Sequence, residues 1–382
     1  MRDDNSVTGP TALEDYELPI DEGDQSGSVA GAVHYAFIGS GQGGSRIAAA
    51  AYARGYRKTI VVNTALQDLE HIDVPQGHKL HMNVGPGGAG KDVVKGEEAA
   101  TKHAPDILDL MRRVFGKVDH IMICAGAGGG SGGGSLIPLI TIVAKKYMQT
   151  LGYVGAEIDQ RVGVILSLPR DSECERVVAS NAITVAEGVS QLAEDQRISP
   201  LLIVDNARIA SLYPQLSVGS LWPTVNNGIV HMFDLFNRLP LEATRYSTFD
   251  PVDYKTVISA GGHMVMGVTK IKADRISGAT ETDVSKMLRH SIDKTLIADG
   301  FDLKQAKVSA AVVVASEATL DSLPDALTEY IYTMLKSITG GVIHRGIYAD
   351  DRDDLRIYTI IGGLPRPARR YDRLRALAAD NY

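Results

Sequence analysis

The sequence predicts an α/β protein built on a doubly wound parallel sheet, and two observations support this prediction. Short apolar runs typical of buried strands alternate with segments of helical composition over residues 33–210. Glycine clusters follow several of these runs, and ligands of such sheets bind at the carboxyl ends of the strands. The expected strands are 35–38, 59–63, 120–125, 162–168 and 201–204, with helices over 45–54 and from 136.

Beyond residue 210 the pattern changes to a long helix and then a smaller α+β unit. Pro223 stands where a helix could begin, and apolar residues follow at helical spacing as far as Phe236. Strand-like runs at 308–315 and 356–361 flank a helix that starts near Pro324. We therefore expect a disordered acidic N-terminal tail over 1–32, a ligand-binding domain over 33–220, a central helix and loop over 221–254, an α+β domain over 255–365 and a basic C-terminal tail over 366–382.

The formal net charge of −7 lies at the N-terminus of the chain. Residues 1–32 hold eight acids and one base, which leaves 38 acids and 38 bases for the rest. So charged and so weakly apolar a segment cannot bury enough surface to fold. Residues 366–382 carry five arginines against two aspartates. That composition suits a solvated tail, or an electrostatic contact with an acidic neighbour such as the head of another subunit.

Cysteine usage and hydropathy argue against several protein classes. Cys124 and Cys174 are the only cysteines, and the N-terminus lacks the build of a secretory signal. A disulfide framework and a zinc pattern are therefore not expected, and a reducing cytoplasm is. The apolar run 136–144 is far shorter than the roughly 20 residues of a membrane helix. Because no basic stripe is interleaved with aromatics, direct nucleic-acid binding is not expected.

The first of three glycine-rich turns runs from Gly39 to Gly44, after a strand and before a helix. Such a turn brings backbone N–H groups close to a phosphate. A dinucleotide-binding fold shares it but expects an acid about 20 residues on for the ribose. Here the second strand ends in Asn63, and the nearest acid is Asp68. A nicotinamide-dependent oxidoreductase of the Rossmann type is therefore kept only as an alternative.

The second turn, residues 85–92, falls one residue short of a P-loop. Asp92 stands where that motif needs a hydroxyl for magnesium, so a flexible glycine loop beside a ligand is favoured. The third turn, from Gly126 to Gly134, lies between a buried strand and an apolar helix, where a Gly–Ser linker has no place. Its consecutive glycines can present N–H donors to phosphate oxygens, with a helix dipole behind them. The sequence thus predicts a phosphate-binding site.

Residues Gly128 to Gly134 resemble the glycine signature of the tubulin/FtsZ superfamily, with Ser131 in place of threonine and Gly133 in place of a small side chain. Other segments match in order: 41–47 is similar to the first tubulin loop, 62–65 to the second FtsZ loop, 88–90 to the loop that touches the γ-phosphate, 205–206 to the tubulin Asp-Asn pair and 343–360 to the closing strands of FtsZ. The resemblance covers about 33–363 and points to a divergent branch such as the archaeal CetZ or the plasmid and phage TubZ proteins.

The resemblance implies a cytoplasmic, cytoskeletal GTPase that polymerises head to tail with copies of itself, with adaptors meeting its tails. It implies GTP or GDP as ligand, with Mg²⁺ held mainly through phosphates and water. For the guanine contact on the central helix, Asn227 is favoured over Asn226. The implied nucleotide-binding residues are Gly41, Gln42, Gly43, Arg46, Asn63, Gly88, Ala89, Gly90, Lys91, Gly128, Gly129, Gly130, Ser131, Gly132, Gly133, Glu173, Asn206, Asn226 and Asn227.

The hydrolytic residues implied by the resemblance lie after the central helix. The family's Asn-x-Asp-x-x-Asp loop is matched by Thr248 to Asp253, so Asp250 and Asp253 are implied to reach the γ-phosphate of the next subunit. Asp253 is favoured as the water-orienting residue. Without the resemblance, Asp250 before Pro251 equally fits a helix N-cap on a surface loop. Thr248 in place of asparagine supports the alternative of a GTP-binding scaffold that does not hydrolyse.

Overall fold

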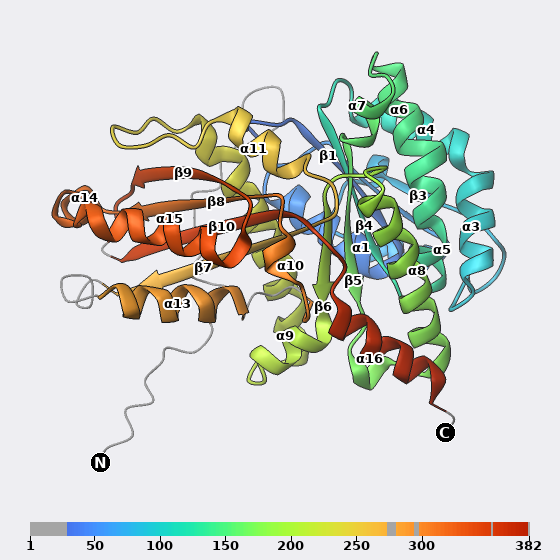
Figure 1. The fold of residues 1–382 in the computed structure, drawn as a ribbon. Helices are drawn as coiled ribbons and strands as arrows, with labels where there is room; N and C mark the ends of the chain where they lie inside the picture. The colour runs from blue at the N-terminus through green and yellow to red at the C-terminus, as the bar shows by residue number, and fades with distance from the viewer. Residues whose placement is uncertain (1–28, 273–279, 294–297, 353, 381–382) are drawn as a thin grey trace.

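One ten-stranded sheet runs through the molecule in the order β3-β2-β1-β4-β5-β6-β7-β10-β8-β9 (Figure 1). The computed structural model describes residues 29–272, 280–293, 298–352 and 354–380, so the predicted N-terminal tail lies, up to residue 28, outside the described residues. The strands are β1 (Tyr35–Ser40), β2 (Thr59–Asn63), β3 (Lys79–His81), β4 (His120–Gly126), β5 (Val162–Leu168), β6 (Leu201–Asp205), β7 (His263–Ile271), β8 (Val308–Ala315), β9 (Val342–Ala349) and β10 (Leu355–Leu364).

Helices cover both faces of this sheet and connect its strands. They are α1 (Gly41–Ala53), α2 (Leu66–Glu70), α3 (Val93–Lys102), α4 (Ala104–Val114), α5 (Gly130–Pro138), α6 (Lys145–Thr150), α7 (Ala156–Asp159), α8 (Arg176–Glu194), α9 (Asn206–Leu212), α10 (Val218–Arg238), α11 (Pro251–Ile258), α13 (Glu281–Asp293), α14 (Glu317–Ser322), α15 (Asp325–Thr339) and α16 (Ala368–Ala379). A π-helical turn, η3 (Leu139–Ala144), joins α5 to α6, and short 3-10 turns include η4 (Asp171–Glu173). No helix of the described ranges is long and apolar enough to cross a lipid bilayer.

The six strands β3, β2, β1, β4, β5 and β6 are all parallel, which confirms the doubly wound prediction. Strand β1 is buried along its whole length, as expected for a strand covered on both faces. Helices α1 and α10 pack on one face, and α4, α5 and α8 pack on the other. Because the strands are parallel, their carboxyl ends share one edge and their amino ends the opposite edge.

The central helix α10 links these two edges. It begins at Val218, five residues before the predicted start at Pro223, because the Ser217 hydroxyl caps it by accepting the Ser220 N–H at 3.2 Å. Near its start the Arg170 guanidinium, just after β5, lies 5.2 Å from the Trp222 ring. At its end the Asn237 side chain accepts the N–H of Val33, just before β1, at 3.0 Å. The 21 residues of α10 therefore run from the carboxyl edge to the amino edge.

The C-terminal half of the sheet is mixed. Strand β10 pairs antiparallel with β7 and β8, and β8 pairs parallel with β9. The predicted strand 308–315 is β8, and the predicted strand 356–361 lies within β10. The first half meets the second where β6 and β7 pair at Leu201 and His263. One continuous sheet thus holds both halves, and the predicted domain boundaries between them stay predictions.

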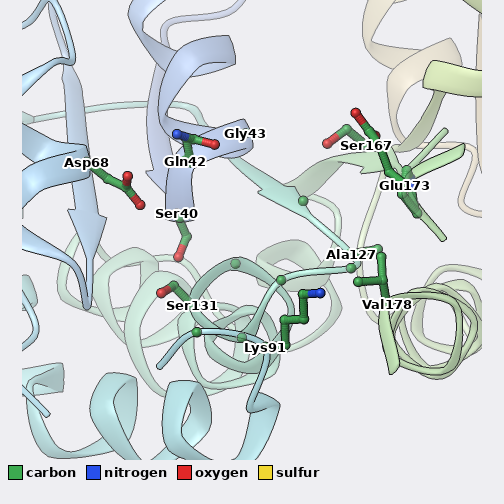
Figure 2. Close-up of a pocket in the computed structure, with 18 of the residues that line it drawn as sticks. Ser40, Gln42, Gly43, Asp68, Lys91, Ala127, Ser131, Ser167, Glu173 and Val178 are labelled. Carbon is green, nitrogen blue, oxygen red and sulfur yellow. The ribbon is translucent and has the colours of Figure 1, made fainter. Parts of the chain in front are cut away.

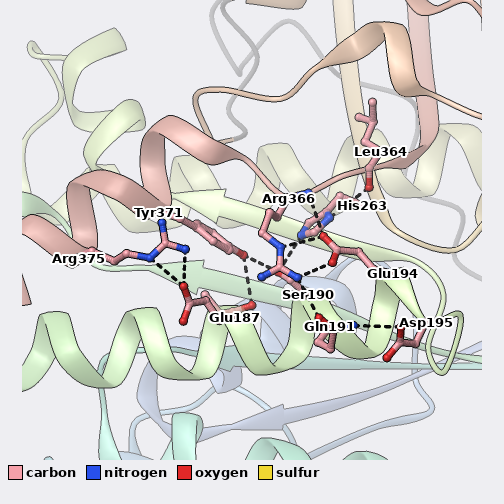
Figure 3. Close-up of polar contacts among 11 residues, drawn as sticks. Glu187, Ser190, Gln191, Glu194, Asp195, His263, Leu364, Arg366, Tyr371 and Arg375 are labelled. Atoms are coloured by element: carbon pink, nitrogen blue, oxygen red, sulfur yellow. Dashed lines mark hydrogen bonds and ion pairs between the residues drawn. The ribbon is translucent and has the colours of Figure 1, made fainter.

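The basic C-terminal segment is not a solvated tail, which corrects the prediction for residues 366–380. It forms α16, which packs along α8 of the same chain (Figure 3). The Arg366 Nε donates to Glu194 at 2.9 Å and the Arg375 Nε donates to Glu187 at 2.9 Å. The buried Tyr371 hydroxyl lies 2.7 Å from the Ser190 hydroxyl. The acidic partners of these arginines therefore lie within the chain itself.

Candidate functional site

A pocket of about 410 Å³ opens at the carboxyl edge of the parallel strands (Figure 2). Its volume falls in the range of roughly 300 to 1,000 Å³ that is usual for small-molecule sites. Most of the residues predicted to bind nucleotide line it, namely Gly41, Gln42, Gly43, Gly90, Lys91, Gly128, Gly129, Gly130, Ser131, Gly132, Glu173 and Asn206. The lining also includes Ser40, Asp68, Gly126, Ala127, Ser167, Pro169 and Val178. The predicted glycine turns therefore converge on one space.

The glycine tract itself begins a helix. Helix α5 starts at Gly130, not near residue 136 as predicted, and Gly129 is its cap. The Gly130 N–H donates to the Gly90 carbonyl at 2.9 Å and the Gly133 N–H donates to the Gly129 carbonyl at 3.1 Å. Between them, Ser131 and Gly132 line the pocket in the first helical turn, where N–H groups have no intrahelical acceptor. This helix start is suited to bind an anion.

Close backbone packing explains why glycines are needed here. A Cβ built on Gly41 would lie 2.8 Å from the Gly132 nitrogen, so a side chain at residue 41 would cover one of these donors. A Cβ on Gly134 would lie 2.0 Å from the Val93 carbonyl oxygen. The first half of the tract thus faces the pocket, whereas Gly134 lets α5 pack closely against α3.

The second glycine turn contributes a cation to the pocket. Gly90 and Lys91 line it, and the Lys91 Nζ lies 2.6 Å from Glu175 Oε2 at the rim. The hydrogen bond from Lys91 holds the pKa of the exposed Glu175 carboxyl below its usual value. Asp92, which takes the place of the P-loop hydroxyl, caps α3 by accepting the N–H groups of Val94 at 3.0 Å and Lys95 at 3.2 Å. Its carboxylate therefore serves the helix.

Asp68 is a lining residue that the sequence analysis did not assign to the site. Figure 2 shows its carboxylate directed into the same space as Ser40 and Ser131. The side-chain N–H of Asn63 donates to Asp68 Oδ2 at 3.2 Å, and the side-chain oxygen of Asn63 accepts the Ala65 N–H at 3.1 Å. Asn63 is 1% exposed and lies outside the lining, where it orients Asp68 and the turn; its predicted nucleotide contact stays a prediction. The position of Asp68 as the first acidic residue after the second strand could have indicated this place in the site.

The other predicted residues that fall outside this lining are Arg46, Gly88, Ala89, Gly133, Asn226 and Asn227. Arg46 is exposed on α1, and Gly133 packs beside the Ala127 carbonyl. The Ala89 N–H donates to the Thr64 hydroxyl at 2.9 Å, and that hydroxyl is hydrogen-bonded to Ser131. Gly88 and Ala89 therefore hold their loop against the pocket wall from behind. On α10, Asn226 is half-buried and Asn227 exposed, and a guanine contact by either stays a prediction.

The predicted catalytic aspartates lie in a loop that their own chain already stabilises. Asp250 caps α11 by accepting the N–H groups of Val252 at 2.7 Å and Asp253 at 2.9 Å. Asp253 returns the contact, since its Oδ2 accepts the Asp250 N–H at 3.2 Å. The Asp253 Oδ1 also lies 2.6 Å from Nδ1 of His344 on β9. The interpretation of Asp250 as a helix N-cap is therefore confirmed. The Asp250 residue is also exposed to solvent.

This aspartate loop and the pocket lie at opposite edges of the sheet. The hydroxyl of Tyr254, next to Asp253, lies 3.0 Å from the hydroxyl of Tyr35, the first residue of β1. Ser40, the last residue of β1, lines the pocket. At about 3.3 Å per residue, the six residues of β1 separate the two edges by roughly 17 Å. Within one copy of the chain the two parts therefore lie well apart.

Comparison with known proteins agrees with this architecture. Residues 247–368 match the family model of the tubulin-like protein TubZ, C-terminal domain. The chain is 24% identical to tubulin-like protein TubZ of Bacillus cereus over 369 residues, covering 88% of this chain and 80% of TubZ.

Solved structures share the fold. A GTPγS-form protofilament of TubZ from Bacillus thuringiensis serovar israelensis superposes with a TM-score of 0.75 at 17% identity, covering 91% of this chain and 90% of that one. A GTPγS-bound protofilament of CetZ2 from Haloferax volcanii gives 0.71 at 20% identity, covering 90% and 98%. The chain thus has the tubulin/FtsZ fold, and the comparisons support the predicted resemblance to this superfamily and to its TubZ and CetZ branches.

Proposed function

We propose that this chain binds GTP in the pocket, assembles head to tail with copies of itself, and hydrolyses GTP where one copy's pocket meets the next copy's aspartate loop. The observation that carries the proposal is the placement of the two parts at opposite edges of one sheet. A head-to-tail contact that does not close generates a filament. TubZ and CetZ2, whose structures are protofilaments, have the same fold. The two free cysteines, Cys124 and Cys174, suit a reducing cytoplasm.

The pocket suits a triphosphate. The N-terminal turns of α1 and α5 direct backbone N–H groups and positive dipole ends into it, and Lys91, paired with Glu175 at the rim, adds an ammonium group. Phosphoryl transfer needs mainly positioning and charge neutralisation, which such a cradle supplies. The role of the lining residues is thus to hold the phosphates in place.

The oxygen-rich side of the pocket suits Mg²⁺. Asp68 and Ser131 offer oxygen atoms, the ligands that this cation prefers. When bound, Mg²⁺ neutralises charge on the β- and γ-phosphates. Within the described residues no group of three or more His, Cys, Asp or Glu could hold a metal ion.

Asp253 is the residue we assign to the attacking water of the neighbour's GTP. A carboxylate has about four acceptor positions, and Asp253 uses one oxygen for the Asp250 N–H and one for His344. Spare positions on both oxygens can orient a water molecule without breaking either contact. Asp250, exposed beside it, adds negative charge to the same surface.

Complementation between two defective variants tests the shared site. Asp253→Ala removes the acid and leaves the pocket intact. Gly129→Leu fills the pocket, because residue 129 has extended backbone (φ −96, ψ 157) and a Cβ there meets no described atom within 4 Å. Each variant alone should lose on the order of 100-fold in phosphate release. An equal mixture should recover activity, because random stacking pairs an intact pocket with an intact acid at about a quarter of the contacts.

Two controls keep this test decisive. His344→Gln breaks the ion pair of Asp253 but keeps the carboxylate, and it should hydrolyse within a few-fold of the wild type. Wild-type phosphate release per chain should also rise with protein concentration. Mixed polymers that contain both variants, as shown by co-sedimentation, yet release no phosphate would refute the shared site. Wild-type filaments that never release phosphate would favour the non-hydrolysing scaffold.

A further inference from the structure

A buried arginine of the C-terminal helix joins two loops that line one end of the pocket. Arg370, on α16, is 4% exposed. Its Nη1 lies 2.6 Å from Asp171 Oδ1 and its Nη2 donates to the Pro169 carbonyl at 2.6 Å. Its Nε lies 3.0 Å from Asp205 Oδ1, which is an ion pair without hydrogen-bond alignment. These partners lie more than 160 residues earlier in the chain. One guanidinium thus holds the loop after β5 and the end of β6 together.

Both loops present side chains to the pocket. Pro169 lines it directly, and Glu173 lines it from the same 3-10 turn, η4, that contains Asp171. Asp205 caps α9 by accepting the Ala207 N–H at 3.1 Å, and the next residue, Asn206, lines the pocket. Burial raises the pKa of the Asp205 carboxyl, and the charge of Arg370 opposes that shift. The arginine therefore favours the ionised cap that places Asn206.

The rest of α16 is attached independently of the pocket. Arg366, just before α16, pairs with Glu194 on α8, and Arg375 of α16 pairs with Glu187 (Figure 3). The buried Tyr371 hydroxyl lies 2.7 Å from the Ser190 hydroxyl. Only the face that carries Arg370 and Arg373 reaches the loop after β5 among the described contacts of the helix, since Arg373 Nε lies 3.0 Å from Asp171 Oδ2. The anchoring of α16 and its contact with the pocket can therefore be separated by substitution.

We propose that Arg370 is a positioning residue for the end of the pocket lined by Pro169, Glu173 and Asn206, so that α16 sets both nucleotide affinity and base selectivity. The amide and carboxylate oxygens at this end can accept hydrogen bonds from the N–H groups of guanine. The inference rests on the proposed GTP site. The planar fork of a guanidinium can meet two carboxylates and a carbonyl at once, which the single ammonium of lysine cannot. A partner that draws α16 away from this position would therefore weaken nucleotide binding without touching the pocket.

The test compares variants by calorimetric titration of GDP and of inosine diphosphate, which lacks the guanine amino group. Arg370→Lys keeps the charge and loses the fork. Arg370→Met with Asp205→Asn removes the pair without leaving a buried unpaired charge, and asparagine can still cap α9. Both should bind GDP about tenfold more weakly, and the preference for GDP over the inosine nucleotide should shrink. Arg375→Ala, on the same helix, should change neither quantity.

Selectivity and turnover separate positioning from a loss of structure. A variant that only unfolds more easily would lower the bound fraction, whereas the GDP preference of its folded molecules would stay at the wild-type value. At saturating GTP, phosphate release per polymerised chain should stay near the wild-type rate. Wild-type affinity and preference in both Arg370 variants would overturn this inference alone. Failure of the wild type to bind GDP would instead overturn the proposed function.

Discussion

The two edges of the parallel sheet build their halves of the proposed site from different parts of the chain. At the carboxyl edge the pocket is made largely of backbone, with glycines from three turns and the first turns of α1 and α5 around an open space. At the amino edge the relevant groups are side chains, and Asp250 and Asp253 already accept hydrogen bonds from their own helix. The backbone donors of the pocket are thus in place within one chain. The carboxylates of the aspartate loop, in contrast, are engaged in hydrogen bonds within their own chain.

This difference indicates what each edge can tolerate. A preformed cradle of N–H donors binds without reorganisation, which is the condition for strong electrostatic stabilisation. It depends on backbones that touch, so an added methyl group is costly there. The aspartate loop depends on one capping box and one ion pair, so a change of charge with preserved shape should leave its fold intact.

The largest effect is expected where α1 touches β4 at the carboxyl edge. A Cβ on Gly44 would lie 2.0 Å from the Cys124 carbonyl oxygen, so Gly44→Ala should lower the free energy of unfolding by about 3 kcal/mol, the upper end for overpacking. The neighbouring Gly43→Ala places its Cβ no closer than 3.5 Å, to the Ser167 hydroxyl, and should change stability by less than about 1 kcal/mol. Urea unfolding measures both. Equal free energies of unfolding for Gly44→Ala and Gly43→Ala would show that close backbone packing does not limit this edge.

A smaller effect per residue is expected from acid, and part of it acts at the amino edge. Burial lowers the pKa of His120, the first residue of β4, and of His263, the first residue of β7, to about 4. Below pH 6.5 the unfolded chain binds protons that the folded chain excludes, so stability falls as the pH drops from 6.5 toward 4. At pH 5 each histidine should cost about 2 kcal/mol.

Urea midpoints at pH 7.5 and pH 5 measure this loss. Each of the single variants His120→Gln and His263→Gln should remove part of the difference between the two midpoints, whatever its effect at pH 7.5. A pH dependence that survives unchanged in both variants would place its origin elsewhere.

The sequence predicted the strands more closely than the helices for a physical reason. Strands β2, β5 and β8 are buried, largely apolar runs, and their observed bounds coincide with those predicted. Helices α1 and α5 begin inside glycine turns, where the low helix propensity of glycine opposes a helix. Close packing of α1 against β4 and of α5 against α3 stabilises these helix starts. Local pattern does not reveal such packing.

The candidate site shows the same division. The glycine turns could be predicted because a backbone that approaches a phosphate closely requires clusters of glycine after strands. The roles of Asn63 and Asp68 depend on how one short turn folds. The partners of Arg366 and Arg375 become visible only once α8 lies beside the C-terminal segment. Contacts over such separations arise only from the tertiary fold. Arg370, whose partners come from two loops, is the clearest example.

The smallest effect, at Asp250, separates the two roles that this residue combines. Asp250→Ala removes the cap of α11 and should lower the free energy of unfolding by about 1 kcal/mol. Asp250→Asn keeps the cap, because asparagine ranks with aspartate at this position, so stability should not change. If the carboxylate also faces the neighbour's phosphates, Asp250→Asn should still lower phosphate release in filaments by about tenfold. If Asp250→Asn hydrolyses GTP at the wild-type rate, Asp250 acts only as the cap of α11, and Asp253 is the acid of the amino edge.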